Sequence, residues 1–348
     1  MRSALPLALL CAIGAGAAAQ ETPVTFEEPQ PVTVTGFAVG RLDYDRLDRS
    51  NSFTAGKIAL SLFKPVGDAY LFGQLTAALD NGETAIAIDN LLFSWTPRTA
   101  NRWTIAFGKF DAPIGFERDD EPLNFLPTNS FNFSFARPGK LTGVAVQYTA
   151  SPTLSVWGMA ANGWNRDVDN NRGKTGLLRA ELLPAAGLSL GVTGVYGPER
   201  DSTDGFQRSL LSADVTLERG RLIVGAEVNL GREQAAPAPT WRGASATAFV
   251  RLSPRVGVAA RVDQLEDRGG ALTGASRILR SLTVGPMWHF STAREGVFSN
   301  IEHTSFHLPQ IAVRAALRVD RSSHPFFPGA SGPGRSDTRG VLELFYVF

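Results

Sequence analysis

The sequence has almost no cysteine, because Cys11 is the only thiol among its 348 residues. This residue lies near the N-terminus, so the rest of the chain cannot form disulfides or use thiol chemistry. An excess of one charge is also missing. The 34 basic residues face 33 acidic ones, and without Arg2 the balance is 33 to 33. A balanced chain gives no reason to expect a nucleic-acid partner.

Long apolar runs are absent as well. The N-terminal stretch MRSALPLALLCAIGAGAAAQ has a charged Arg2, an apolar run over residues 5–13, and small residues at Ala17 and Ala19. This pattern predicts a secretory signal peptide over residues 1–19, followed by a short segment over 20–31. The run is far shorter than the roughly 20 residues of a spanning helix, and no later run is long enough either.

Alternation of polarity takes the place of a helical period. In RLIVGAEVNL (221–230) the even positions are apolar and the odd ones polar or glycine, except for Ile223. RVGVAARVDQ (255–264) and IAVRAALRVD (311–320) repeat the pattern. Because alternate side chains of a strand point to opposite faces, each segment predicts a strand with one apolar and one polar face.

The connections between these segments indicate which solvent surrounds them. Tight turns are expected at 151–152, 217–221 and 252–255, and long polar connections at 164–173, 198–206, 232–239, 267–276 and 322–337. Short turns at one rim and long loops at the other are typical of an outer-membrane barrel, with the short turns on the periplasmic side.

The pattern predicts an all-β fold, a transmembrane antiparallel β-barrel over residues 32–348. About 16 strands are expected, an even number as in bacterial single-chain barrels. They are 32–44, 53–63, 69–78, 84–95, 102–110, 140–150, 153–163, 174–183, 187–197, 207–218, 220–231, 240–252, 255–266, 277–290, 308–321 and 338–348. The apolar phase slips in 84–95 and 153–163, which indicates bulges.

The chain ends on the alternating row RGVLELFYVF, whose last residue is Phe348. In a closed barrel the last strand pairs with the first, so these residues lie in the wall and Phe348 can face lipid at the periplasmic interface.

One connection is much longer than the others. Residues 111–139, between the fifth and sixth predicted strands, contain five phenylalanines and the charged stretch Glu117, Arg118, Asp119, Asp120 and Glu121. Connections of this length are commonly functional or disordered, and the aromatic content argues against disorder. We therefore expect this loop to fold into the barrel lumen.

Three stretches resemble a known family. FGKFDAPIGFERDDEPLNF (107–125), FARPGKLTGVAVQY (135–148) and HTSFHLPQIAVRAALRVDRS (303–322) are similar to the OmpL-like β-barrel porins. The resemblance implies an outer-membrane porin of a Gram-negative-type cell, a passive channel for small hydrophilic solutes or ions. The long loop resembles the infolded constriction loop of general porins, so its five charged residues are candidate constriction residues.

The lumen-facing positions of the predicted strands supply further candidates. Opposed charges across a water-filled gap would set ion preference. The candidate lumen residues are Arg179, Arg221, Glu227, Arg251, Arg255, Arg261, Asp263, Arg314 and Arg318.

The expected partners follow from the resemblance. They are outer-membrane lipids, small hydrophilic solutes and the assembly machinery, which reads a terminal strand like the one ending at Phe348. Analogy with general porins favours a homotrimer, although one sequence reveals no interface.

Two alternatives stay open. The same loop could close the lumen and leave a non-conducting structural or adhesive barrel. A barrel-embedded hydrolase is less favoured, because His303, Ser305 and His307 are neighbours in sequence only. No metal spacing of strong type and no cofactor motif occurs, so neither a metal nor a cofactor is expected.

Overall fold

The computed structural model describes residues 31–80, 83–291 and 303–348. The predicted signal peptide and almost all of the segment over 20–31 lie outside the described residues. Within the described parts of the chain, the short helices have neither the length nor the apolar content to cross a membrane.

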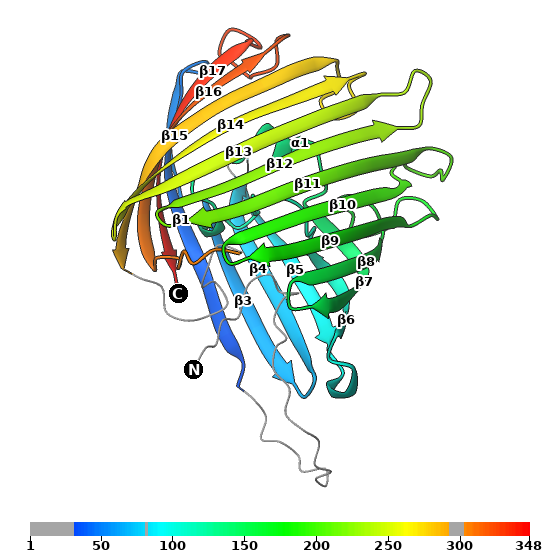
Figure 1. Ribbon diagram of the computed structural model, residues 1–348. Coiled ribbons are helices and arrows are strands. Elements are labelled where there is room, and N and C mark those ends of the chain that lie inside the picture. Colours follow the sequence, from blue (N-terminus) through cyan, green and yellow to red (C-terminus); the bar gives the residue numbers. More distant parts are fainter. Residues whose placement is uncertain (1–30, 81–82, 292–302) are drawn as a thin grey trace.

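The strands form one antiparallel sheet that closes on itself (Figure 1). They are β1 (Thr33–Asp45), β2 (Ser50–Thr54), β3 (Lys57–Val66), β4 (Ala69–Asp80), β5 (Glu83–Trp95), β6 (Trp103–Asp111), β7 (Lys140–Ser151), β8 (Leu154–Ala161), β9 (Thr175–Ala185), β10 (Leu188–Pro198), β11 (Gln207–Arg219), β12 (Leu222–Glu233), β13 (Thr240–Ser253), β14 (Val256–Arg268), β15 (Arg277–Ser291), β16 (Ile311–Ser322) and β17 (Ser336–Val347).

β2 and β3 pair with successive parts of β1, so they are two halves of one interrupted strand. The wall therefore has 16 strand positions, and the predicted barrel and strand number are confirmed.

The first and last strands close the barrel. β1 pairs with β17 from Phe37 opposite Val347 to Asp45 opposite Arg339. Beyond this ladder, Gly36 and Phe348 exchange two backbone hydrogen bonds of 2.9 Å. The terminal Phe348 is 41% exposed on the outer surface, which fits the lipid-facing position predicted for it.

The alternation in the sequence separates the two faces of the wall. On β14, Val262 is 56% exposed, whereas its neighbours Arg261 and Asp263 are buried inside the barrel. Ile223, the apolar exception in its segment, is also buried inside, where it joins the interior hydrophobic cluster. Large aromatic side chains stay exposed near the strand ends, as membrane-interface residues do; they include Trp95, Trp103, Tyr196, Trp288 and Phe290.

The ends of the barrel differ as predicted. Tight turns join β3 to β4, β9 to β10, β11 to β12 and β13 to β14, and the predicted long polar connections lie at the opposite rim; the connection from β15 to β16 is the exception, because it is long and lies at the tight-turn rim. The β4–β5 ladder shifts register at Asp89, where the sequence indicated a bulge. In the β7–β8 pair the extra residue is Ala150 of β7, outside the segment 153–163.

Candidate channel and its inward loop

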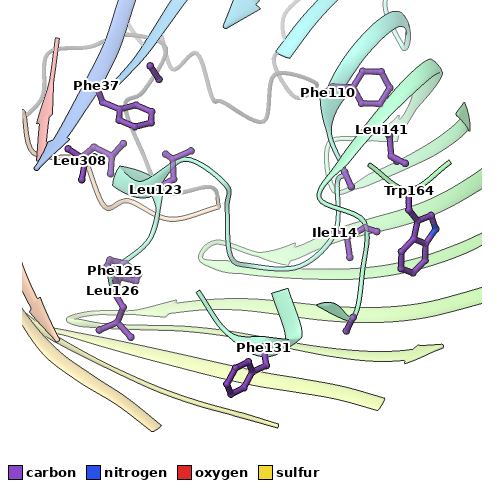
Figure 2. Close-up of a cluster of buried hydrophobic side chains, with 14 of the residues drawn as sticks. Phe37, Phe110, Ile114, Leu123, Phe125, Leu126, Phe131, Leu141, Trp164 and Leu308 are labelled. Carbon is purple, nitrogen blue, oxygen red and sulfur yellow. The ribbon is translucent and has the colours of Figure 1, made fainter. Parts of the chain in front are cut away.

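The connection between β6 and β7 runs into the interior of the barrel. It contains two short helices, η2 (Glu121–Leu123) and α1 (Phe131–Phe135). α1 packs against β13, β14 and β15, and lies within the ring of strands in Figure 1. Figure 2 shows the buried apolar side chains that the loop carries, among them Ile114, Leu123, Phe125, Leu126 and Phe131. We call residues 112–139 the inward loop.

Polar side chains fix the local shape of the inward loop. Ser130 caps α1 by accepting a 2.9 Å hydrogen bond from the Phe133 amide, as expected of an N-cap serine. The Glu117 carboxylate accepts from the Ser130 amide at 2.9 Å. Asn124 accepts from the Arg118 amide at 3.0 Å and donates to the Arg118 carbonyl at 2.7 Å. These bonds hold the charged stretch in one compact turn.

The wall opposite carries its charges in two rows. One register line across neighbouring strands holds carboxylates interspersed with small residues: Asp337, Asp320, Ser281, Asp263, Ser245, Glu227, Asp214, Gly191 and Glu181. We call it the acid row. Two residues along the strands lies the arginine row, which holds Arg339, Arg318, Thr283 and Arg261.

The inward loop docks on both rows. Arg261 donates to Glu117 at 2.9 Å, and Asp263 accepts from the Phe131 amide at 2.9 Å. Arg137 of the loop lies 3.1 Å from Glu227. All of these side chains are buried. Burying a charge is costly unless it is paired and hydrogen-bonded, so the pairing fixes where the loop can sit.

Arginines also hold the loop through its backbone. Arg314 donates to the Glu121 carbonyl at 3.0 Å and is paired with Glu343. Arg318 donates to the Asn129 carbonyl at 2.5 Å while it pairs with Asp320 at 2.8 Å. These contacts span the middle of the loop, so both of its halves are attached to the wall.

Glycines of the wall let the loop approach closely. A Cβ atom at Gly225 would lie 2.1 Å from the Phe116 ring, and one at Gly243 would lie 1.9 Å from the Asn132 side-chain oxygen. Real Cβ atoms do not approach so closely, so the loop packs on bare backbone at these two positions.

Two lysines hold the other flank of the loop. Lys57 of β3 lies 3.8 Å from Asp120 and 3.4 Å from Glu121. Lys140 contacts Asp89 at 2.8 Å and Asp119 at 3.3 Å. Burial raises the pKa of the Asp120 carboxyl in this loop to about 7, although the nearby Lys57 ammonium partly opposes the effect.

Two cavities flank the loop. One of about 340 Å³ lies between the loop and the wall of β1, β16 and β17; it is lined by Arg41, Asp43, Asp119, Glu121, Pro127, Thr128, Asn129, Arg318, Arg339 and Val341. We call it the eyelet cavity. A second, of about 570 Å³, lies beside α1 and the β8–β9 connection, and its lining includes Lys109, Arg137, Lys140, Asn165, Arg166 and Asp167. Asp119 lines both cavities.

The predicted loop residues thus have different positions. Glu117 is buried against the wall and Arg118 donates to the Gly115 carbonyl at 2.7 Å. Asp120 is buried next to Lys57. Asp119 and Glu121 face the eyelet cavity.

The predicted wall residues also separate into groups. Arg261, Arg314 and Arg318 contact the loop, as do Glu227 and Asp263. Arg179 pairs instead with Asp214 at 2.6 Å and Glu181 at 3.2 Å. Arg251 lies near the tight-turn rim, with its guanidinium over the Phe306 ring.

Arg221 and Arg255 lie outside the strands. Both belong to the tight turns that precede β12 and β14, and both are exposed. Alternation assigns a side chain to one face only while the chain is extended, so it does not apply to residues in these turns.

Several residues at the cavities were not among the sequence candidates. They are Arg41, Asp43, Lys140 and Arg339, which line the cavities, and Lys57, which contacts the lining residue Glu121. The alternation rule could have found Arg41 and Asp43, because they share the face of the buried Phe37 and Val39 on β1.

This architecture can be compared with those of known proteins. The family model described as "Putative beta-barrel porin-2, OmpL-like" matches residues 48–348. No curated protein matches the chain.

Three solved structures share the fold at low sequence identity. An anion-selective porin from Comamonas acidovorans has a TM-score of 0.66 at 9% identity, covering 91% of this chain and 99% of that one. The outer-membrane channel DcaP of Acinetobacter baumannii has a TM-score of 0.63 at 11% identity, covering 91% and 97%. The trimer form of OmpT, an outer-membrane protein of Vibrio cholerae, has a TM-score of 0.62 at 12% identity, covering 91% and 99%.

The family match covers most of the chain and includes the inward loop and every strand except β1. This protein therefore belongs to the OmpL-like β-barrel porin family and is an outer-membrane porin.

Proposed function

We propose that the protein is a passive diffusion channel for small hydrophilic solutes or ions, with its narrowest part at the eyelet cavity. The observation that carries the proposal is this cavity of about 340 Å³, which has charged side chains on both of its sides. Asp119 also lines the larger cavity next to it, which supports a continuous polar path past the loop.

Charge is arranged across the eyelet cavity. The wall supplies Arg41, Arg318 and Arg339, and the loop supplies Asp119 and Glu121. Opposite charges across a narrow polar gap orient dipolar solutes and attract ions of both signs. The wall also supplies Asp43, so three acidic side chains balance the three arginines around the cavity. We therefore expect only weak preference between anions and cations.

A transport role without catalysis fits the histidine region. His303 lies 3.2 Å from Glu181 of β9, whereas the Ser305 hydroxyl and amide both donate to Glu218 of β11, the amide at 2.6 Å. The two side chains therefore have separate partners, whereas a nucleophile and its base must lie within hydrogen-bond reach of each other. We propose that the protein is not an enzyme.

The alternative is a barrel closed by the same loop. It is favoured by the buried apolar contact between the loop and β13, where Phe125 stacks on Phe249 at 4.1 Å between ring centroids. The buried pairs Arg261–Glu117 and Arg137–Glu227 support it as well.

Single-channel recording of the refolded protein in a planar bilayer separates the two. Stepwise conductance, with a small reversal potential in a salt gradient, is expected of the proposed channel. A heat-modifiable, correctly folded barrel that stays silent would overturn the proposal and favour the closed barrel. Shortening the loop over residues 119–129 should then open it.

Assembly and export form a second part of the proposal. The fold is shared with a trimer form of another outer-membrane protein, which supports a homotrimer. Cross-linking in native outer membranes tests it, and a monomer at every cross-linker concentration contradicts it.

We also propose cleavage after residue 19 and recognition of the Phe348 strand by the assembly machinery. N-terminal sequencing and a Phe348→Ala variant test these two points.

A further inference from the structure

A second segment enters the barrel, from the end opposite the inward loop. β15 ends at Ser291 and β16 begins at Ile311, at the rim where the other connections are tight turns. In the described part of this connection, residues 303–310, Phe306 is 3% exposed and Leu308 is 1% exposed. Their side chains are therefore inside the barrel and not in the periplasm.

Phe306 packs directly on the inward loop. Its ring lies edge-on to Phe125 of the loop and to Phe249 of β13, with centroid distances of 5.2 Å in both cases. The His289 ring packs edge-on against Phe306 at 5.3 Å. Edge-to-face aromatic pairs are specific in geometry and add to the free energy of burial. Phe306 therefore fixes the position of Phe125 from the tight-turn end of the barrel.

Leu308 extends this contact along the loop. Leu308 belongs to the same buried cluster as Leu123 of the loop and Phe37 of β1, and Figure 2 draws the three in one region of that cluster. Leu123 closes the helix η2, whose first residue, Glu121, lines the eyelet cavity. The buried cluster that contains Leu308 thus includes the part of the loop that borders the cavity.

Polar contacts attach the segment to the wall on its other side. The Ser305 amide donates to the Glu218 carboxylate at 2.6 Å, and His303 lies 3.2 Å from Glu181. These acids belong to β11 and β9, which lie four and six strand positions from β15 along the sheet. The segment is therefore attached to the wall through His303 and Ser305 and packed on the loop through Phe306.

We propose that residues 303–308 form a periplasmic strut that positions the inward loop and so sets the width of the eyelet cavity, with Phe306 as the positioning residue. The proposal rests on the channel function proposed above. It extends that function by making the aperture depend on a segment that does not line the eyelet cavity itself.

The variant Phe306→Ala tests the proposal. Without the ring, Phe125 keeps its stacking on Phe249 but loses the edge contact that holds it from the tight-turn end. The loop can then shift, so we expect larger and noisier single-channel steps, with roughly twofold higher conductance. Phe290→Ala is the matched control, because Phe290 is 61% exposed on β15 at the same end of the barrel. The control should conduct as the wild type does.

Amide hydrogen exchange gives a readout that does not need conduction. Faster exchange over residues 120–128 in Phe306→Ala, and not in Phe290→Ala, is the expected result. If the wild type conducts and neither exchange nor conductance changes in Phe306→Ala, the strut is overturned and the channel stands. If the wild type is silent, the channel function fails, and the exchange result alone supports or overturns the strut.

Discussion

The two flanks of the inward loop use charged side chains in opposite ways. Toward β14, Glu117 and Arg261 meet in a contact from which water is excluded, with both side chains at most 5% exposed. Toward the eyelet cavity, the Asp119 side chain is 41% exposed although it contacts Lys140. The first flank attaches the loop, and the second faces the proposed path of the solute.

The difference does not come from the residue types. Arg261 and Arg318 occupy the same row of the wall, and each is followed two residues later by an aspartate of the acid row. Arg261 is covered by the loop, whereas Arg318 contacts the loop and also lines the eyelet cavity. The path of the loop decides which arginines it covers completely and which also line the cavity.

The largest effect is expected on the buried flank. Arg261→Met leaves the buried Glu117 and Asp263 carboxylates without their cation. Removing one partner of a buried ion pair costs about 3–5 kcal/mol, so we expect the loop to detach while the barrel stays folded. Hydrogen exchange over residues 114–131 should rise strongly, and the single-channel conductance should increase.

An exposed ion pair supplies the control for this comparison. Arg268 lies 2.7 Å from Glu266, but the Arg268 side chain is 61% exposed. Arg268→Met should therefore cost about 1 kcal/mol or less. Equal exchange rates over residues 114–131 in the two variants would show that Arg261 does not hold the loop.

A smaller effect is expected from filling the wall glycines. In Gly225→Ala the new methyl group would overlap the Phe116 ring, which lies 2.1 Å from the Cβ position. Overpacking of this kind costs about 1–3 kcal/mol, so the exchange of residues 114–118 should increase. Gly194→Ala is the control, because no atom lies within 4 Å of its Cβ position. A loop equally protected in both variants argues against close docking at Gly225.

The open flank can be tested through ion selectivity. Asp119→Asn should shift the reversal potential toward anions, and Arg339→Gln should shift it toward cations. A unit charge on the protein and a permeating ion about 4 Å away interact in water by about 1 kcal/mol. Each permeability ratio should therefore change roughly fivefold. Asp201→Asn is the control, since this side chain is 75% exposed in an outer loop. Shifts of the same sign in the first two variants contradict the proposed field.

The sequence predicted the wall well, because a strand has a period of two and its pattern is local. Arg314 and Glu343, for example, are inward-facing in the sequence pattern and lie opposite each other in the β16–β17 ladder. The same rule does not extend into the turns, where Arg221 and Arg255 are exposed.

The contacts of the loop could not be predicted in this way. Glu117 and Arg261 are 144 residues apart, and their contact depends on the register of every strand between them. The connection after β15 is likewise conspicuous in the sequence for its length alone. Nothing local to Phe306 indicates that its ring points into the barrel and meets Phe125.

A further effect is expected from pH, acting through Asp120 on the lysine flank of the loop. This loop carboxyl is buried, accepts a 3.1 Å hydrogen bond from Gln74 and has a pKa raised from 3.8 to about 7. A carboxyl whose pKa is raised by folding favours the docked loop when protonated. The penalty for ionisation therefore grows as pH rises above about 4 and is complete above about 7.

The wild-type loop should accordingly be better protected at pH 5 than at pH 8. Its selectivity should move toward cations over the same range, because Asp120 gains a negative charge. Asp120→Asn should flatten both trends, while Asp201→Asn should leave them intact. Reversal potentials and exchange rates measured at pH 5, 6, 7 and 8 check this directly. If the pH dependence persists unchanged in Asp120→Asn, another group titrates. The selectivity of the channel then does not depend on the ionisation of Asp120.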